Sequence, residues 1–127
     1  MNDRVAIAIQ EHSNGKQTVA ENIAGCSKFI ICELVENKSL VKTEVYFNPL
    51  VDEPNCAYQL TDYLKQFNVN AIIAGKMGQK AVNKFLKYNI NVFTAPGLTY
   101  KEAFDLYLND KLKGHKASSN QREHIHN

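Results

Sequence analysis

Runs of apolar residues and helically spaced apolar residues follow one another along most of the chain. Five runs are typical of strands, because they are rich in branched or aromatic side chains and end at turn-forming residues. They cover Val5–Ile9, Lys28–Val35, Leu40–Phe47, Ala71–Ala74 and Asn91–Thr94. The first run is apolar at every position, which predicts a strand covered on both faces.

Three other segments place apolar residues on one face of a helix. Two run from about Cys56 to Phe67 and from about Gln79 to Tyr88. The third begins at Thr99, where Thr99 and Glu102 have the form of a capping box. Residues 10–25 are polar and contain a turn, which predicts a long loop.

This order of elements predicts a single α/β domain over residues 1–112, followed by a polar, disordered tail over residues 113–127. The short turn at Glu36–Ser39 makes the second strand antiparallel to its neighbours. Helical crossovers make the last two strands parallel. We therefore expect a five-stranded mixed sheet with helices on both faces, in an order similar to that of ribonuclease-H-like domains.

Composition narrows the classes of function. The chain has 127 residues, 44% of them hydrophobic and 22% charged, as in ordinary globular domains. A net charge of +2 gives no argument for nucleic acid, and no apolar run approaches the roughly 20 residues of a membrane helix. The start of the chain lacks the layout of a signal peptide, so we expect a cytoplasmic protein with neither nucleic-acid nor membrane partners.

The predicted topology brings several segments to one edge of the sheet. This edge collects the 10–25 loop, the turn Gly75–Gly78 and residues 95–97. It also collects Cys26, just before the second strand, and Cys56, just after the third. Ligands usually bind at the carboxyl ends of parallel strands, so this edge is the candidate site.

The turn Gly75-Lys76-Met77-Gly78 leads from a strand into a helix. Free amides at a helix start favour an anion, and Lys76 and Lys80 add positive charge. Under the alternative interpretation, the two glycines only make the turn.

The chain has three cysteines and no CxxC pair, which argues against a disulfide framework and a structural zinc site. Thiolates are soft ligands for iron–sulfur units, and helix-start amides and lysines lower a thiol pKa. Cys26 and Cys56 are therefore candidate metal ligands, with His12 as a third; alternatively they are small boundary residues and a solvated histidine. Cys32 lies mid-strand and is expected in the core. His124 and His126 are interpreted as incidental to the tail.

No enzyme motif is present. The sequence contains no GxSxG, HExxH or P-loop pattern, and the first strand lacks the acidic metal ligands of a ribonuclease-H-like nuclease. We therefore expect a protein that is not an enzyme.

Three segments resemble the dinitrogenase iron–molybdenum cofactor biosynthesis family, which includes NifX-like domains and the C-terminal domain of NifB. They are Asn48-Pro49, the turn Ala74–Gly78, and Thr99–Phe104 leading to Tyr107-Leu108. The resemblance covers about Val5 to Leu112. It implies a ribonuclease-H-like fold and binding of iron–molybdenum cofactor, its precursor or an iron–sulfur cluster for transfer to cofactor-assembly or acceptor proteins.

One segment departs from the family pattern. The first loop of the family typically ends in a motif with a histidine and an arginine, and here Asn22 and Gly25 stand at those positions. Two hypotheses follow. In the first, the chain is a carrier that binds a cluster at the edge, with Cys26 as a replacement ligand. In the second, it is a protein–protein interaction module that has lost the metal site.

Overall fold

The computed structural model describes residues 3–36, 38–51 and 53–115. The strands are β1 (Asp3–Glu11), β2 (Gln17–Val19), β3 (Lys28–Leu34), β4 (Leu40–Phe47), β5 (Ala71–Ala74), β6 (Asn91–Thr94) and β7 (Lys113–His115). The helices are α1 (Cys56–Lys65), α2 (Gln79–Lys87), α3 (Tyr100–Leu108) and the short 3-10 helix η1 (Ile23–Gly25).

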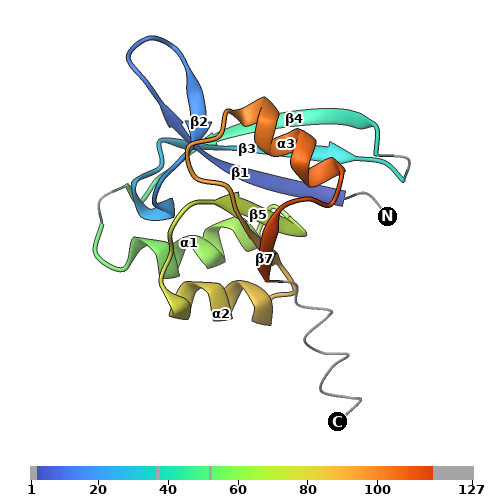
Figure 1. Ribbon diagram of the computed structural model, residues 1–127. Helices are drawn as coiled ribbons and strands as arrows, with labels where there is room; N and C mark the ends of the chain where they lie inside the picture. The colour runs from blue at the N-terminus through green and yellow to red at the C-terminus, as the bar shows by residue number, and fades with distance from the viewer. Residues whose placement is uncertain (1–2, 37, 52, 116–127) are drawn as a thin grey trace.

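The strands form one mixed sheet in the order β4-β3-β1-β5-β6-β7, and β2 pairs with β1 beside this path (Figure 1). β3 is antiparallel to β1 and β4, whereas β1, β5 and β6 are parallel. The predicted reversal of the second expected strand and the parallel crossovers are thereby confirmed. The carboxyl ends of β1, β5 and β6 consequently meet at one edge.

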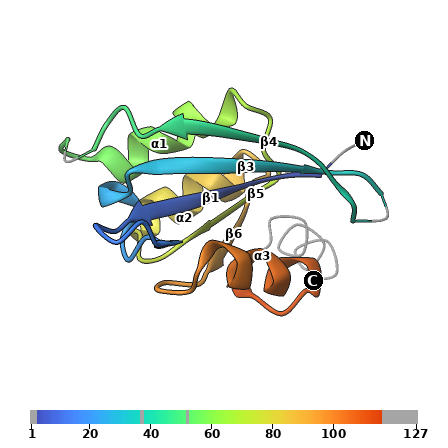
Figure 2. The same ribbon diagram turned by 90° about the horizontal axis from the view of Figure 1, so that it is seen from above.

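Helices cover both faces of the sheet, as predicted. Figure 2 shows α1 and α2 on one side and α3 on the other. The side chains of β1 divide between two buried clusters: Ala6 and Ala8 pack with α1 and α2, and Ile7 and Ile9 pack with α3. Burial on both faces explains why this strand is apolar without alternation.

The predicted number of strands was wrong, since the described part of the chain contains seven rather than five. β2 lies within the expected long loop and forms a hairpin with the end of β1, pairing Ile9 with Val19 and Glu11 with Gln17. Three residues are too few to show an alternating pattern. Besides its pairing with β1, β2 is held by a remote segment through the bond from Val19 N–H to Leu98 O at 2.7 Å.

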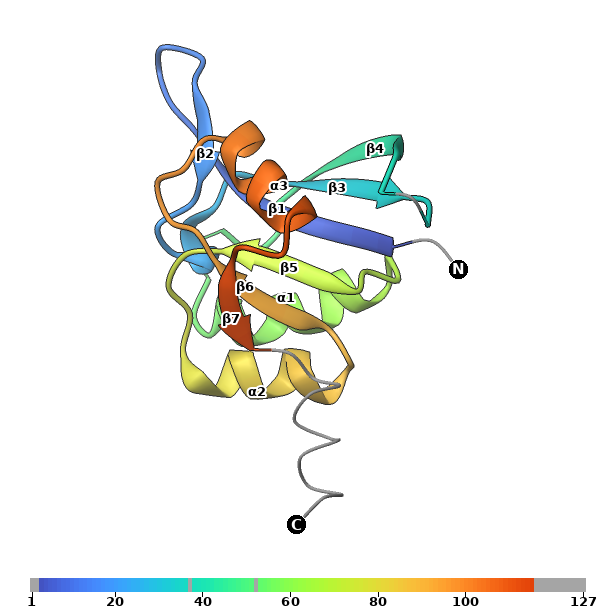
Figure 3. The ribbon, with the colours of Figure 1, turned by 45° about the vertical axis from the view of Figure 1, so that its right-hand side comes forward.

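β7 occupies the first three residues of the expected tail and pairs antiparallel with β6 (Figure 3). Its residues are all exposed, so the sequence contains no apolar pattern that would predict this strand. Gly114 is required there, because a Cβ would collide with the backbone of Val92 and Phe93. Residues 116–127 lie outside the described residues, so the disordered tail and the role of His124 and His126 stay predictions. The ribonuclease-H-like assignment also stays a prediction.

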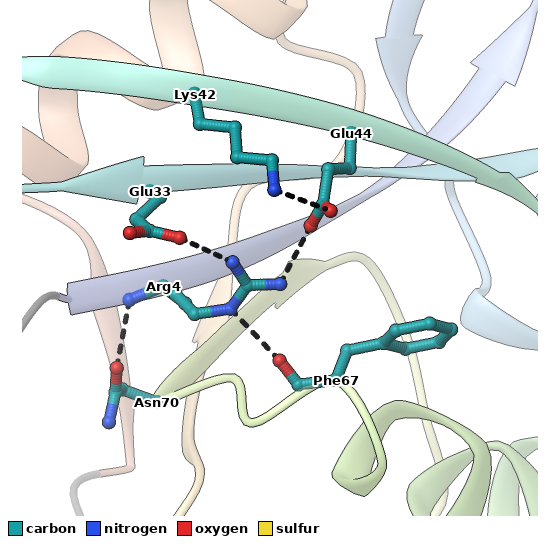
Figure 4. A network of polar contacts seen from close by, with 6 residues as sticks. All are labelled: Arg4, Glu33, Lys42, Glu44, Phe67 and Asn70. Carbon is teal, nitrogen blue, oxygen red and sulfur yellow. Dashed lines mark hydrogen bonds and ion pairs between the residues drawn. The ribbon is translucent and has the colours of Figure 1, made fainter.

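A network centred on Arg4 ties the sheet together at the end opposite the candidate site (Figure 4). The guanidinium donates to Glu33 at 2.6 Å, to Glu44 at 2.7 Å and to the carbonyl oxygen of Phe67 at 2.9 Å. Lys42 lies 3.3 Å from the same Glu44 carboxylate. One side chain therefore links β1, β3, β4 and the segment after α1.

The third helix begins as predicted. The hydroxyl of Thr99 accepts from Glu102 N–H at 3.2 Å, and the Glu102 carboxylate accepts from Thr99 N–H at 2.9 Å, which completes the capping box. At the other end of the helix, Tyr107 donates to Asp3 at 2.6 Å. None of the helices in the described ranges is long and apolar enough to span a membrane.

Candidate functional site

The segment 20–25 lies directly against the end of β5. Lys76 N–H donates to Glu21 O at 2.5 Å, and Ile23 N–H donates to Lys76 O at 3.1 Å. Asn22 and Lys76 form a parallel bridge. The predicted meeting of the first loop with the glycine turn at one edge is therefore observed.

Residues 95–98 complete the same edge. Gly97 N–H donates to Val19 O at 3.1 Å, and Gly97 has a φ of +82°, which favours glycine. A Cβ on Gly97 would lie 3.4 Å from a carboxylate oxygen of Glu21. The ends of β2, β5 and β6 are thus joined through backbone groups.

The two glycines of the turn have different roles. A Cβ on Gly75 would collide with the carbonyl oxygens of Ala20 and Glu21, so this position must be glycine for the loop to approach β5. A Cβ on Gly78 would meet no heavy atom within 4 Å. Gly75 is thus explained by packing alone, whereas Gly78 faces open space at the start of α2.

The start of α2 carries positive charge. Gly78 provides no side-chain cap, and the first turn contains no acidic residue. Lys76 and Lys80 are exposed, whereas Met77 is half-buried against the core. Free amides and the helix dipole add to the positive field there. This part of the edge is suited to an anion.

Cys26 lies in the protein interior rather than at the lip of a cleft. Its exposure is 0%, and the side-chain amide of Asn48 donates to its carbonyl oxygen at 3.0 Å and to its sulfur at 3.6 Å. Burial raises the pKa of the Cys26 thiol to about 12. The shift is opposite to the lowering expected from helix-start amides and lysines, because desolvation is the largest influence on this thiol and outweighs the hydrogen bond from Asn48. The thiol is therefore protonated at neutral pH.

Cys56, the first residue of α1, is also buried, at 2% exposure. Its thiol donates to Ala24 O at 3.5 Å. The negative charge of a Cys56 thiolate would further raise the pKa of Cys26, so the two thiols are electrostatic neighbours. Cys26 and Cys56 are thus brought together as predicted, but behind the backbone of residues 24–26.

Cys32 belongs to the core, as predicted, and lies on the other face of the sheet. Its sulfur is 3.4 Å from the hydroxyl of Tyr100 in α3. Burial raises the pKa of both groups.

His12 lies in the exposed turn of the β1–β2 hairpin, which projects from the domain in Figure 1. Its Nε2 is 2.8 Å from the hydroxyl of Thr18. Among the described residues, no group of at least three histidine, cysteine, aspartate or glutamate side chains is arranged to hold a metal ion. His12 and the two cysteines therefore do not form a ready ligand set.

Two features of this region were not anticipated from the sequence. Asn48 is buried and organises residues 24–26, since its amide also lies 3.4 Å from Ala24 O and its Oδ1 accepts from Leu50 N–H at 2.9 Å. The sequence feature that could have indicated this role is a polar residue next to a strand-ending proline.

The second feature is a groove of about 870 Å³ between α1 and α2, which starts at Gly78. The spacing of Lys80, Lys84 and Lys87, which all line it, was the signal for this groove.

Comparison with known proteins identifies relatives of the whole domain. The family described as "Dinitrogenase iron-molybdenum cofactor" matches residues 3–110. Curated proteins give no match. Of the solved structures, PH0822 superposes with a TM-score of 0.71 at 19% identity, covering 87% of this chain and 95% of that chain.

Two further structures are similar at comparable levels. The protein mj0327 of Methanocaldococcus jannaschii has a TM-score of 0.68 at 24% identity, over 90% of this chain and 95% of that chain. The apo form of the orange protein from Desulfovibrio gigas has a TM-score of 0.69 at 16% identity, over 88% of this chain and 92% of that chain. These structural likenesses concern the fold. Because the family match spans residues 3–110, the chain belongs to the dinitrogenase iron-molybdenum cofactor family.

Proposed function

We propose that the chain is a non-enzymatic accessory protein that binds an anionic metallocluster and passes it to cofactor-assembly or acceptor proteins. The cargo is an iron–molybdenum-type cluster, its precursor or an iron–sulfur cluster, a class supported by family membership. The observation that carries the proposal is the juxtaposition of Lys76, Lys80 and the uncapped start of α2 at the edge where residues 20–25 meet β5.

Charge is the main reason for placing the cargo at this edge. Thiolate- or sulfide-bound clusters are negatively charged, and helix-start amides and lysines stabilise negative charge. Gly78 leaves room beside these groups, and Met77 offers a half-buried thioether. We therefore assign Gly75, Lys76, Met77 and Gly78 to the cargo site, with Gly75 acting through the backbone geometry.

Direct ligation of a cluster by the cysteine sulfurs would require a change in the structure. Cys26 and Cys56 are buried behind Ala24 and Asn48, and Cys26 holds its proton at neutral pH. In the described arrangement the thiols do not fit a cluster. Coordination by Cys26, Cys56 or His12 therefore needs residues 24–26 to move away, whereas binding through amides and lysines needs no movement.

Anaerobic reconstitution with iron and sulfide, followed by desalting and visible absorption, tests this function. The wild-type chain should retain a chromophore, and the double substitution K76E/K80E should reduce the retained iron by about tenfold or more, because it reverses two charges. Lys111→Glu, an exposed charge reversal beyond α3, is the control and should retain the wild-type amount. The absence of any chromophore in the wild-type chain would overturn the proposal.

Cys26→Ser separates the two ways of binding. If amides and lysines hold the cluster, this variant retains the wild-type amount of iron. If residues 24–26 open and Cys26 becomes a ligand, the variant loses its chromophore while Lys111→Glu keeps it.

The burial of Cys26 and Cys56 favours a second candidate function, a protein–protein interaction module without a metal site. The replacement of the expected histidine and arginine by Asn22 and Gly25 supports the same alternative. It predicts that protein purified without oxygen contains no metal but captures a stable protein partner. Stoichiometric iron or molybdenum in the purified protein would exclude it.

A further inference from the structure

The strand β4, which lies at one end of the sheet, has an open side. It pairs with β3 along one side, and none of the described residues pairs with the other. Its apolar side chains are unusually accessible: Leu40 is 46% exposed, Val41 55%, Val45 52% and Phe47 74%. Edge strands normally avoid such residues, because an open apolar edge recruits another strand. This strand therefore has the composition of an interface.

The backbone groups along the open side can be assigned from the pairing with β3. Asn48 N–H donates to Ser27 O at 3.0 Å, one residue beyond the pair formed by Phe47 and Lys28. In an antiparallel ladder, successive residues direct their N–H and C=O groups to opposite sides. Thr43, Val45 and Phe47 therefore direct theirs outward. The Phe47 carbonyl oxygen already accepts from the Tyr63 hydroxyl at 3.4 Å, so Thr43 and Val45 offer the groups to which a further strand can bind.

The side chains of these residues share one face of the sheet. Tyr46 stacks on Phe67 with ring centroids 4.2 Å apart, on the face covered by α1 and α2. Because side chains alternate along a strand, Thr43, Val45 and Phe47 lie on the α3 face. A second strand along β4 would cover Val45 and Phe47 in part.

We propose that two copies of this chain associate through β4, with the two strands antiparallel and a two-fold axis passing through Thr43. In this register Thr43 faces Thr43 of the second copy, and Lys42 faces Glu44 of the second copy on both sides of the axis. Val45 faces Val41 of the second copy. The edge is thus self-complementary in charge and in apolar contacts.

Other registers are less favourable. Moving the second strand by two residues places Glu44 opposite Glu44 of the second copy, and directly opposed like charges destabilise a strand pair. A further two-residue shift places Glu44 opposite Tyr46 and leaves Lys42 without an acidic neighbour across the interface. A one-residue shift places side chains from opposite faces together. The Thr43-centred register is the one that pairs both charges.

The residues that give this register its charge pairing, Lys42, Thr43 and Glu44, lie in the regular part of β4. Pairing with β3 is continuous from Lys42 to Phe47, and it shifts between Glu33 and Leu34, so the irregularity falls at Val41. Glu44 is held by Arg4 of β1 at 2.7 Å, and Lys42 lies 3.3 Å from Glu44, so Lys42 of a second copy would join an ion-pair network that each copy already contains. The inference does not depend on cluster binding.

Sedimentation equilibrium of the full chain over a wide concentration range tests the proposal. The wild-type chain should show a monomer–dimer equilibrium. Thr43→Pro should weaken association by at least tenfold, because it removes an outward N–H at the axis and leaves the hydrogen bonds to β3 intact. Thr43→Val, which keeps the N–H, should associate like the wild-type chain. Far-UV circular dichroism and thermal unfolding establish that each variant is folded.

A wild-type chain that remains monomeric up to millimolar concentration would overturn the proposal. A folded Thr43→Pro variant that dimerises like the wild-type chain would overturn it as well. If Thr43→Pro does not fold, Val45→Lys replaces it, since a lysine on the open edge opposes strand pairing.

Cross-linking tests the register. Facing residues in an antiparallel pair have Cα atoms about 5.5 Å apart, a distance that a disulfide can bridge. Under mild oxidation the variant T43C should form a covalent dimer, whereas V45C should not, because its copies lie about four residues apart along the strands. A covalent dimer of V45C without one of T43C would overturn the assigned register.

Discussion

The side-chain amide of Asn48 donates to the carbonyl oxygen of Cys26 at 3.0 Å, which ties the end of β4 to the segment before β3. The same amide lies 3.4 Å from Ala24 O, and the Asn48 oxygen accepts from Leu50 N–H. Because Asn48 is buried, these bonds replace water for the carbonyls of the site segment. Asn48 thereby holds residues 24–26, the segment that contains Cys26 and whose Ala24 carbonyl oxygen accepts from the Cys56 thiol.

Replacement of Asn48 by alanine should destabilise the fold by about 1–3 kcal/mol, because it leaves buried carbonyl groups without a donor. Chemical denaturation measures the change. Asn83→Ala, at an exposed position of α2, should stay within about 0.5 kcal/mol of the wild-type value. If both substitutions changed the free energy of unfolding equally, the hydrogen bonds of Asn48 would contribute no more to stability than the exposed side chain of Asn83.

The same Asn48→Ala variant should expose the thiols. Cys26 and Cys56 in the native wild-type chain should react slowly with a thiol reagent at neutral pH, because both are buried and Cys26 is protonated. The variant should react faster than expected from its global unfolding alone. The reaction is followed spectroscopically, and an unchanged rate would contradict the covering role of Asn48.

Replacement of Gly75 by alanine should cost more than about 3 kcal/mol or prevent folding. The added Cβ would collide with the backbone of Ala20 and Glu21, and overpacking against flexible side chains already costs up to about 3 kcal/mol. Gly25→Ala is the matched control, since its Cβ would meet no heavy atom within 4 Å and should change stability little. Thermal unfolding distinguishes the two, and a fully stable Gly75→Ala chain would contradict the close approach of the loop.

Stability should fall as the pH rises from about 9 to about 12. Burial raises the pKa of Cys26 from 9.0 to about 12, so in this window the unfolded chain loses a proton that the native chain keeps. One such group lowers the free energy of unfolding by up to about 1.4 kcal/mol per pH unit. Cys26→Ala should show a shallower decrease in denaturation experiments across this range. If Cys26→Ala and the wild-type chain showed the same decrease in stability between these pH values, Cys26 would not be the cause of that decrease.

Replacement of Arg4 by leucine should destabilise the fold by about 1.5–3 kcal/mol at neutral pH, because charge-assisted hydrogen bonds to Glu33 and Glu44 are lost. Arg4 holds the pKa of Glu44 below its ordinary value of 4.5, so this stabilisation is present above that pH and is lost as the pH falls through the lowered pKa. The difference between wild type and variant should therefore shrink in acid.

Lys38→Met is the control for the Arg4 substitution. It removes two exposed contacts of the Lys38 nitrogen, a hydrogen bond to Leu108 O at 2.6 Å and an ion pair with an Asp110 oxygen at 3.5 Å, and exposed contacts of this kind contribute little. Urea denaturation at several pH values gives both comparisons. If the difference in the free energy of unfolding between wild type and Arg4→Leu stayed the same in acid, ionised Glu44 would not be its cause.

Most of the fold could be predicted from local pattern. The five expected strands and three expected helices correspond to β1, β3, β4, β5, β6, α1, α2 and α3. Each of these elements buries at least one face or ends at a strong turn or cap, so its periodicity is visible in the chain. The strands β2 and β7 lack that signal, because each is only three residues long. β2 also bonds to the remote Leu98, and β7 pairs with residues of β6 such as Val92 that lie far away in sequence.

The meeting of the segments at this edge could be predicted from the sequence, whereas the burial of the two thiols could not. Topology correctly brought residues 20–26, Cys56 and the turn Gly75–Gly78 to one edge. The thiol pKa was expected in the wrong direction, because spacing along the chain reveals nearby charges but not the depth at which a group is buried. Cys26 lies within the buried cluster on the α1 and α2 face, and Asn48 holds the backbone of residues 24–26 there.

The sequence by itself determined the α/β class, the order and direction of the main strands, and the edge where the segments meet. These follow from local periodicity, caps and the handedness of crossovers, which are encoded within short stretches. Only the tertiary structure decided that Gly75 serves loop packing, that Cys26 and Cys56 are covered, and that β4 keeps an open edge. Each of these depends on which remote atoms exclude water from a group, and that is a property of the assembled chain.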